Sequence, residues 1–206
     1  MAASPEATRE IGRRWDRRAR VYDLLMAPME RMMGFTTARA WVAARAAKGR
    51  VLEIGAGTGR NLRYYPAGTL VVATDVSPRM LARAAGKAAG RPAVRFVVAD
   101  AERLPFRDGA FDRVVATFVF CSVADPVRAL RDVRRVLRDD GEAVLLEHMR
   151  PHARLGRLFD LLDPLVSRLW GPHINRRTLE NVRSAGLVTV EERRIVSDWV
   201  KIIIVR

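Results

Sequence analysis

The chain has 206 residues, of which 49% are hydrophobic, so it is long enough for one well-buried α/β domain and too short for two ordinary domains. Its single cysteine, Cys121, excludes a disulfide framework and a zinc site built from thiolates. The formal net charge of +14 favours an anionic partner, either nucleic acid or an anionic membrane surface; a GC-rich genome would explain only the preference for arginine over lysine.

The first predicted element is a helix over residues 8–26. Apolar side chains recur along it and just beyond it at steps of three and four residues: Ile11, Trp15, Tyr22, Leu25 and Met29. Arginines fall mainly on the other side: Arg9, Arg13, Arg17 and Arg20. A helix of this kind either lies in a bilayer interface, attracted by anionic lipids, or packs as a lid over a pocket, and both interpretations stay open.

Pro28 is expected to interrupt this helix, and a second helix is expected to continue to about residue 47. We therefore predict that residues 1–47 form an amphipathic helical lid or membrane-contact segment. Residues 48–206 would form the main domain, so that the chain is a single globular unit overall.

From residue 51 onward, short β-rich runs alternate with helical stretches. Strands are predicted over residues 51–54, 70–74, 94–99, 112–120, 142–148, 188–196 and 199–205. Alternation of this kind indicates an α/β fold, in which crossover helices cover both faces of a mostly parallel sheet.

Three glycines follow the first predicted strand. Gly55, Gly57 and Gly59 are typical of a loop that lets a ligand approach the backbone closely. The spacing differs from the dinucleotide fingerprint G-x-G-x-x-G, because the third glycine comes one residue early and Arg60 holds its place. The loop therefore predicts a ligand that resembles a nicotinamide nucleotide without being one.

Acidic residues lie at the ends of the first three predicted strands. Asp75 is placed to hold the two hydroxyls of a ribose, and Asp100 to reach the exocyclic amine of an adenine. Glu53 is placed to meet a cationic amino group. Three acids and a glycine turn, without a lysine to cradle phosphate, predict an adenosyl ligand that lacks phosphates.

Four segments, in this order, resemble the motifs of class I S-adenosylmethionine-dependent methyltransferases of the ubiquinone/menaquinone-biosynthesis type: EIGAGTG, TDVSPRML, VVADAERLPFRDGAFDRVV and LRDVRRVLRDDGEAVLLEHM. The resemblance covers residues 50–150. It implies a Rossmann-like sheet of seven mostly parallel strands with helices on both faces, whose last, antiparallel strand would contain the C-terminal IIIV.

The same resemblance implies S-adenosylmethionine as the cofactor, S-adenosylhomocysteine as its product, and no metal. Glu53, Gly55 and Gly57 would contact the methionine part, with Ala56 beside them. Asp75 would bind the ribose. The adenine would contact Asp100 and Ala101 and lie between Val76 and Leu104, and Thr117 completes the predicted cofactor-binding set.

The methyl acceptor is predicted from two later segments. FVFCSVADPVRAL and LDPLVSRLWGPHINRRTLENVRSAGL resemble the soluble bacterial phosphatidylethanolamine N-methyltransferases and the methyltransferase-like thiol S-methyltransferases. Both branches act on lipid-like or hydrophobic acceptors, and we expect the amine of phosphatidylethanolamine. The alternatives are a thiol, a carbon of a quinone precursor and, less favoured, RNA, for which neither an N/D-P-P-Y/F motif nor an RNA-binding module is seen.

Two residues are predicted to take part in the transfer. Tyr22, in a Tyr-Asp pair that the family places over the pocket, would present its ring to the sulfonium and the acceptor. His148 would act as base or contact the headgroup, and a purely structural histidine is the alternative. His173, Arg176 and Arg177 would bind a phosphate of the acceptor, unless they form only a solvated helix start. Cys121 is expected to be buried and not nucleophilic.

The first residues do not resemble a secretory signal, and the chain has no run of about eighteen uncharged apolar residues. We therefore expect a cytoplasmic protein, peripheral on the inner face of the membrane and attracted there by the N-terminal helix.

Overall fold

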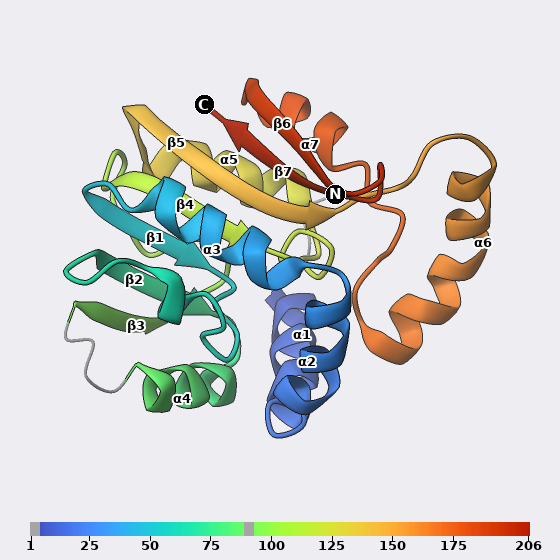
Figure 1. Ribbon diagram of the computed structural model, residues 1–206, viewed down its shortest axis with the longest axis horizontal. Coiled ribbons are helices and arrows are strands. Elements are labelled where there is room, and N and C mark those ends of the chain that lie inside the picture. Colours follow the sequence, from blue (N-terminus) through green and yellow to red (C-terminus); the bar gives the residue numbers. More distant parts are fainter. Residues whose placement is uncertain (1–4, 89–92) are drawn as a thin grey trace.

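A seven-stranded sheet forms the centre of the computed structural model, which describes residues 5–88 and 93–206 (Figure 1). The strands are β1 (Arg50–Ile54), β2 (Leu70–Asp75), β3 (Val94–Val98), β4 (Phe111–Thr117), β5 (Leu137–His148), β6 (Thr189–Val196) and β7 (Val200–Val205). Their order is β3-β2-β1-β4-β5-β7-β6. Strands β1 to β5 pair in parallel, whereas β7 runs antiparallel to β5 and β6. The predicted Rossmann-like sheet, including its antiparallel C-terminal strand, is confirmed.

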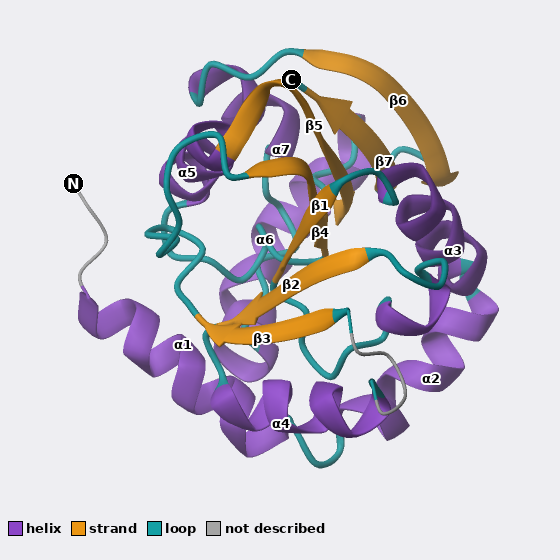
Figure 2. Cartoon of the chain, turned by 90° about the vertical axis from the view of Figure 1, so that its left-hand side faces the viewer, coloured by secondary structure: helices purple, strands orange, loops and turns teal. Residues whose placement is uncertain are grey.

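The helices surround this sheet. They are α1 (Pro5–Arg18), α2 (Tyr22–Met32), α3 (Phe35–Ala46), α4 (Pro78–Lys87), α5 (Pro126–Val136), α6 (Ala153–Trp170) and α7 (Thr178–Ser184), with a 3₁₀ turn η1 (Leu62–Tyr64). Helices α3 and α4 contribute to one hydrophobic cluster, and α5 and α7 to another on the opposite side of the sheet (Figure 2). Because both faces are covered, the central strands are apolar without alternation, as parallel strands usually are.

In the N-terminal segment, the helices end and begin at other residues than predicted. The first helix ends at Arg18, and Pro28 lies inside α2. A proline is tolerated there because the residue four positions earlier, Leu24, is 77% exposed, so that solvent can satisfy the carbonyl that the proline leaves free. The break between α2 and α3 falls at Gly34, whose φ of +71° suits glycine. Residues 1–4 of the predicted segment lie outside the described residues.

Two strand boundaries also differ. Strand β4 ends at Thr117 and not at residue 120, because Phe118 has a φ of +57° and turns the chain out of the sheet. Strand β5 begins at Leu137 and not at residue 142, since Leu137 pairs with Phe111, and the register shifts between this pair and the next pair, Arg113 and Glu142. Both differences lie at strand ends, where side-chain periodicity gives little information.

Candidate functional site

A cavity opens at the carboxyl ends of β1, β2 and β4, where the strand order reverses between β1 and β4. Such a switch point is where open α/β sheets bind their ligands. Most of the predicted cofactor residues line it: Gly55, Gly57, Asp75, Val76, Asp100, Ala101 and Thr117. Glu53, Ala56 and Leu104 are buried behind the lining.

The glycine loop lets the backbone itself form part of the cavity wall. Gly55 and Gly57 have φ values of +60° and +55°, which side chains rarely adopt. A Cβ atom on Gly55 would lie 2.6 Å from Cγ2 of Val119, whereas one on Gly57 would meet no atom nearer than 4.0 Å. The wall therefore stays open beside Gly57, where a ligand can approach the main chain.

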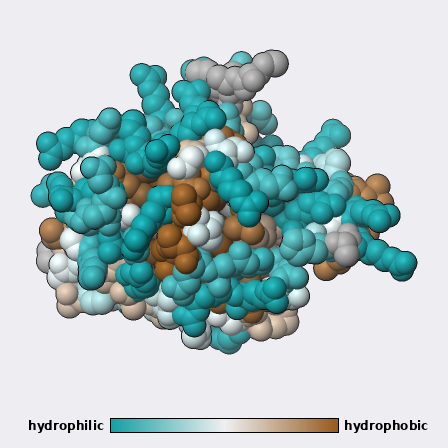
Figure 3. Space-filling view, turned by 90° about the horizontal axis from the view of Figure 1, so that it is seen from above, coloured by the Kyte–Doolittle hydropathy of each residue, from teal (hydrophilic) through white to brown (hydrophobic). Residues whose placement is uncertain are grey.

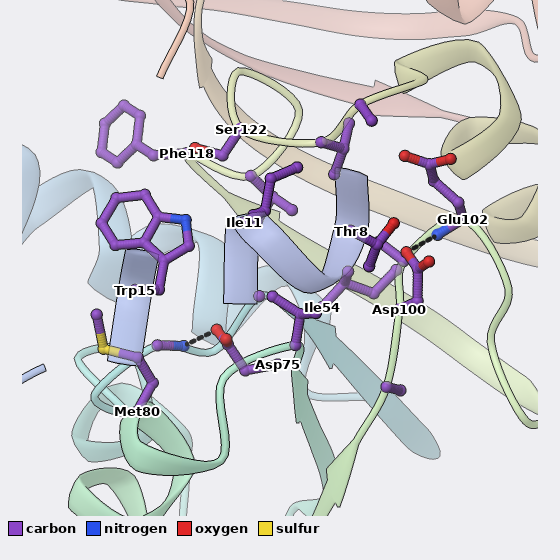
Figure 4. A pocket seen from close by; sticks show the side chains of 18 of the residues that line it. Thr8, Ile11, Trp15, Ile54, Asp75, Met80, Asp100, Glu102, Phe118 and Ser122 are labelled. Atoms are coloured by element: carbon purple, nitrogen blue, oxygen red, sulfur yellow. Dashed lines mark hydrogen bonds between the residues drawn. The ribbon is translucent and has the colours of Figure 1, made fainter. Parts of the chain in front are cut away.

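Asp75 is held by the loops on either side of it. Its two carboxylate oxygens accept hydrogen bonds from the backbone N–H groups of Gly57 (2.9 Å) and Ser77 (2.8 Å), the former drawn in Figure 4. Burial raises the pKa of Asp75 to about 6, and these two N–H groups oppose that rise. Each oxygen keeps a lone pair with which to accept a hydrogen bond from a ribose hydroxyl.

Asp100 and Glu102 form the acidic end of the cavity. The N–H of Glu102 donates to Oδ1 of Asp100 at 2.9 Å, and Glu102 accepts from the N–H of Asp125 at 2.8 Å. Burial is the main cause that raises the pKa of Glu102. The loop after β3 therefore presents an anchored carboxylate next to the apolar Ala101, a combination that suits the amine edge of an adenine.

Glu53 lies at the end of β1, behind the glycine loop. Its Oε2 atom is buried and has no hydrogen-bond partner among the described residues, and burial raises its pKa to about 7. A buried carboxylate oxygen without a partner is costly unless a ligand satisfies it. The orphaned oxygen, the open wall at Gly57 and the oriented Asp75 together fit the amino-acid and ribose parts of S-adenosylmethionine.

Arg60, which replaces the third glycine of the dinucleotide fingerprint, anchors α2 over the glycine loop. Its guanidinium contacts Asp23 at 3.0 Å and Glu30 at 2.6 Å, and Thr58 also donates to Asp23 at 2.7 Å. The Tyr-Asp pair is thus held over the pocket by its aspartate, which leaves the ring of Tyr22 against the cavity.

A buried polar chain continues from α2 to the end of β4. Arg39 contacts Glu30 at 2.8 Å and donates to Asn61 at 2.8 Å, and the Asn61 amide donates to the Thr117 hydroxyl at 3.0 Å. Because every step joins a different element, the network fixes α2, α3, the glycine loop and the cavity wall relative to one another.

Helix α1 closes the cavity from the opposite side. Thr8, Ile11 and Trp15 line it (Figure 4), and Asp16 accepts hydrogen bonds from the hydroxyl of Ser77 (2.6 Å) and the N–H of Arg79 (3.1 Å). Gly12 permits the close approach, since a Cβ there would lie 3.2 Å from the carbonyl oxygen of Val76. From the sequence, the apolar stripe of this helix could belong either to a lid or to a membrane contact. In the structure, Ile11 and Trp15 of that stripe face the cavity.

Aromatic rings gather at the end of the cavity remote from Asp100. Trp15 meets Tyr22 edge-on at 5.9 Å between ring centroids, and Phe118 stacks on His148 at 6.0 Å. His148 does not line the cavity but lies behind Phe118. Burial lowers its pKa to about 4, so its imidazole is neutral at pH 7 and a weak base.

The residues predicted to hold a phosphate lie outside the cavity lining. His173 pairs with Asp163 at 2.8 Å, and Arg177 pairs with Glu180 at 3.3 Å. Arg176 donates to the carbonyl of Val123, a residue of the cavity wall, at 2.8 Å. Arg176 and Arg177 line a second, separate hollow together with Arg150 and Lys201, so the structure does not bring them to the cofactor cavity.

Several lining residues carry no signal in the sequence as site residues. Thr8, Met80, Phe118 and Ser122 are of this kind. Buried Glu147 organises the wall from behind, because its Oε1 accepts from the N–H groups of Val119 (2.7 Å) and Phe120 (3.2 Å). Burial raises the pKa of Glu147 to about 8. The only hint of this role in the sequence is an acid inside an apolar strand.

Neither a metal cluster nor a membrane span emerges from the residues that the structure describes. Over residues 5–88 and 93–206, no group of three or more His, Cys, Asp and Glu side chains is placed to hold a metal ion. In the same ranges, no helix combines the length and apolarity needed to cross a bilayer.

Comparison with known proteins identifies several methyltransferases as relatives of this chain. A methyltransferase-domain family matches residues 52–145. Demethylmenaquinone methyltransferase of Clavibacter sepedonicus is 35% identical over 213 residues, which cover 91% of this chain and 86% of that protein. Human thiol S-methyltransferase TMT1A is 35% identical over 70% of this chain. Phosphatidylethanolamine N-methyltransferase of Cereibacter sphaeroides is 41% identical over 48% of this chain and 51% of its own length.

The coverage of these relatives is uneven. The matched region spans 62% of human TMT1A and 45% of human TMT1B, less than two thirds of either. Among solved structures, an S-adenosylmethionine-dependent methyltransferase of Thermotoga maritima has a TM-score of 0.69 at 20% identity, over 94% of this chain and 98% of that chain. CalH, solved with S-adenosylhomocysteine, has a TM-score of 0.62 at 22% identity, over 83% of this chain and 55% of that chain. At these identities the two structures support the fold.

Proposed function

Since the chain belongs to the S-adenosylmethionine-dependent methyltransferases, we propose that it methylates a hydrophobic or lipid-like small molecule, with the amine of phosphatidylethanolamine as the acceptor. One observation carries this proposal: the cavity has two chemically different ends (Figure 4). Asp100 and Glu102 lie at one end and Asp75 at its centre, whereas Trp15 and Phe118 lie at the other. The polar part suits an adenosyl group, and the aromatic part suits an apolar acceptor.

We assign the cofactor contacts as follows. Glu53 accepts a hydrogen bond from the cationic amino group, Asp75 binds the ribose hydroxyls, and Asp100 binds the adenine amine next to Ala101. When bound, S-adenosylmethionine supplies a methyl group on a sulfonium, which is a good leaving group. The residues of the chain therefore contribute chiefly by holding the two reactants in line.

At the acceptor end, the rings of Trp15, Tyr22 and Phe118 exclude water and present aromatic faces. Such faces favour a cation, as N-methylated amines are after transfer. An amine must be neutral to attack, and His148, with a pKa of about 4, takes up a proton poorly at pH 7. We therefore expect the acceptor proton to leave to solvent, and we reassign His148 from base to a positioning residue behind Phe118.

Helix α1 would act as the lid of this site. As it lies, the cavity measures about 100 Å³, which is less than the roughly 300 Å³ from which small-molecule sites usually start. An outward movement of α1 would widen the cavity for the ligand. It would break the contacts of Asp16 with the start of α4 and those of Arg14 and Arg18 with α6.

Two other acceptors are supported by relatives. The thiol S-methyltransferases TMT1A and TMT1B favour a thiol, and the demethylmenaquinone methyltransferase, with the widest coverage of those described above, favours a quinone precursor. A nucleic-acid acceptor is supported only by the net charge of +14.

The test is transfer of a labelled methyl group to four acceptors: phosphatidylethanolamine in mixed micelles, a small thiol, a demethylated quinol and transfer RNA. Mass spectrometry of the products should find methylated phosphatidylethanolamine, at a rate that rises with pH as the amine becomes neutral. The variant His148→Gln should keep that pH profile. Brisk methylation of the thiol or the quinol, without methylated lipid, would reject the proposed acceptor in favour of that branch.

A further inference from the structure

Helix α6 carries an exposed apolar face at the edge of the molecule, away from the sheet (Figure 1). Its six leucines are between 40% and 75% exposed: Leu155, Leu158, Leu161, Leu162, Leu165 and Leu169. Trp170, at its end, is 58% exposed. In the space-filling view from above, hydrophobic side chains appear at this end of the molecule among hydrophilic ones (Figure 3).

The leucines share one side of the helix. They follow one another at steps of three and four residues, apart from the adjacent pair Leu161 and Leu162, so they fall within one arc of the helical surface. Three exposed arginines lie on the same helix beside that arc: Arg154, Arg157 and Arg168. An apolar stripe bordered by arginine is typical of a helix that lies in a bilayer interface.

The other side of α6 is fixed to the protein, so the leucines cannot turn inward. Asp163 is buried and accepts from the N–H of Ile174 at 2.7 Å as well as pairing with His173. Phe159 meets Trp199 edge-on at 6.0 Å. At the C-terminal end of the helix, Arg14 and Arg18 of α1 donate to backbone carbonyls of α6.

We infer that α6 is the surface by which this protein docks on an anionic phospholipid bilayer, with the leucines in the acyl boundary and the three arginines at the headgroups. The charge of the chain indicates which partner fits this apolar face. A net charge of +14 and arginines along the apolar arc match an anionic lipid surface. The inference extends the proposed function and rests on it, because it assigns the membrane contact to α6, whereas the sequence alone allows α1 to be either that contact or a lid.

A row of aromatic rings connects this surface with the cofactor cavity. Phe159 of α6 contacts Trp199, which stacks on His148 at 6.2 Å, which in turn stacks on Phe118 of the cavity wall. The buried side of α6 and the acceptor end of the site are therefore linked by consecutive ring contacts.

The experiment measures co-sedimentation of the full chain with vesicles of phosphatidylcholine, alone or mixed with phosphatidylglycerol, in the absence of any methyl acceptor. We expect binding to the anionic vesicles. The variant Leu158→Gln/Leu161→Gln/Leu165→Gln should weaken it by at least about tenfold, since it removes apolar area from the interface. Arg154→Gln/Arg157→Gln/Arg168→Gln should weaken it on anionic vesicles only.

A matched control replaces exposed apolar residues elsewhere. Val188→Gln/Val190→Gln, at positions 65% and 48% exposed near β6, should leave vesicle binding unchanged. An unchanged affinity for S-adenosylhomocysteine would show that the variants fold. A third variant, Arg9→Gln/Arg13→Gln/Arg17→Gln, tests whether α1 provides the contact.

Two results would overturn the inference. One is vesicle binding that survives the leucine changes but is lost with the α1 arginines. The other is a dimer in sedimentation velocity that the leucine changes dissociate, without vesicle binding by the unaltered protein, which would make this face a contact between two copies of the chain. If the leucine changes abolish vesicle binding while phosphatidylethanolamine is not methylated, the inference stands and the proposed acceptor fails.

Discussion

At the scale of single residues, Asp75 links the two loops of the proposed ribose site. Because its oxygens hold the N–H groups of both Gly57 and Ser77, an asparagine there would place an amide donor against a backbone donor. Asp75→Asn should therefore weaken binding of S-adenosylhomocysteine by about 1.5–3 kcal/mol, as expected for hydrogen bonds to a charged group. Calorimetric titration measures this. Asp140→Asn, at an exposed site remote from the cavity, is the control, and equal affinities for the two variants would remove Asp75 from the assignment.

The raised pKa of Glu53 leads us to expect that cofactor binding depends on pH. Its pKa is about 7 without ligand, and a cationic amino group favours its charged form, so binding must release its proton at lower pH. Affinity for S-adenosylhomocysteine should therefore rise as the pH increases from about 6 to about 8. Calorimetry in buffers of different ionisation enthalpy should detect the released proton. Glu53→Gln should lose the rise near pH 7 and keep only a weaker dependence at lower pH, from Asp75 with its pKa of about 6. A profile unaltered by Glu53→Gln would contradict this role.

The raised pKa of Glu147 leads us to expect that the stability of the fold depends on pH. Its pKa of about 8 lies above the ordinary value of 4.5, so the folded state binds more protons than the unfolded state between these limits. The free energy of unfolding should accordingly fall as the pH rises toward 8, and no further above it. Glu147→Gln keeps an acceptor for Val119 and Phe120 but cannot ionise, so its melting temperature should vary less between about pH 7 and pH 9. Melting curves of both proteins over this range provide the test, in which parallel curves would be the contrary result.

At the scale of elements, α1 and α2 lie over the same site but are attached in different ways. Helix α2 is held through ion pairs of Glu30 and Asp23 with Arg60, and Glu30 is buried. Helix α1 is held by Asp16 at the first turn of α4, a position where a negative charge also interacts favourably with the helix dipole, and by Arg14 and Arg18, which donate to backbone carbonyls of α6. We therefore expect α2 to remain in place and α1 to be the part that opens.

Loosening α1 should change the kinetics of the cofactor. Asp16→Asn weakens two hydrogen bonds to a charged acceptor, so S-adenosylhomocysteine should dissociate faster, by roughly fivefold for a loss of about 1 kcal/mol. Trp15 lines the cavity and provides a fluorescence signal for stopped-flow measurement. Glu10→Gln, on the same helix but paired only with Arg14 at 3.6 Å, is the control. Equal dissociation rates for the two variants would argue against α1 as the lid.

At the scale of the whole molecule, the positive charge and the apolar face of α6 should act together. The net charge of +14 attracts an anionic surface from a distance, whereas the leucines contribute only on contact. Added sodium chloride should therefore weaken binding to anionic vesicles while leaving the affinity for S-adenosylhomocysteine almost unchanged, because Glu53 and Asp75, two of the groups proposed to bind the cofactor, are buried. Vesicle binding that is insensitive to salt would mean that charge plays no part in the attraction.

The sheet, and the cavity proposed as the cofactor site, could both be predicted from local patterns in the sequence. Apolar runs of β-rich residues indicate buried parallel strands. The carboxyl ends of parallel strands lie at one edge of the sheet, so a glycine turn and acidic residues at those ends come close together. These signals are local, so Gly57, Asp75 and Asp100 could be assigned to one cavity before any coordinates. The strand limits at Thr117 and Leu137 could not, because a positive φ at Phe118 and a register shift between β4 and β5 leave no trace in periodicity.

The direction in which each amphipathic helix faces could not be predicted and becomes visible in the packing of the fold. Periodicity reveals an apolar stripe but not what covers it, and the same pattern describes α1, which lines the cavity, and the exposed α6. Packing turned Ile11 and Trp15 of α1 toward the cavity, and left the leucines of α6 toward solvent because Asp163 and Phe159 hold its other side. Burial also set the pKa of His148 near 4, since desolvation depends on neighbours that are distant in the chain.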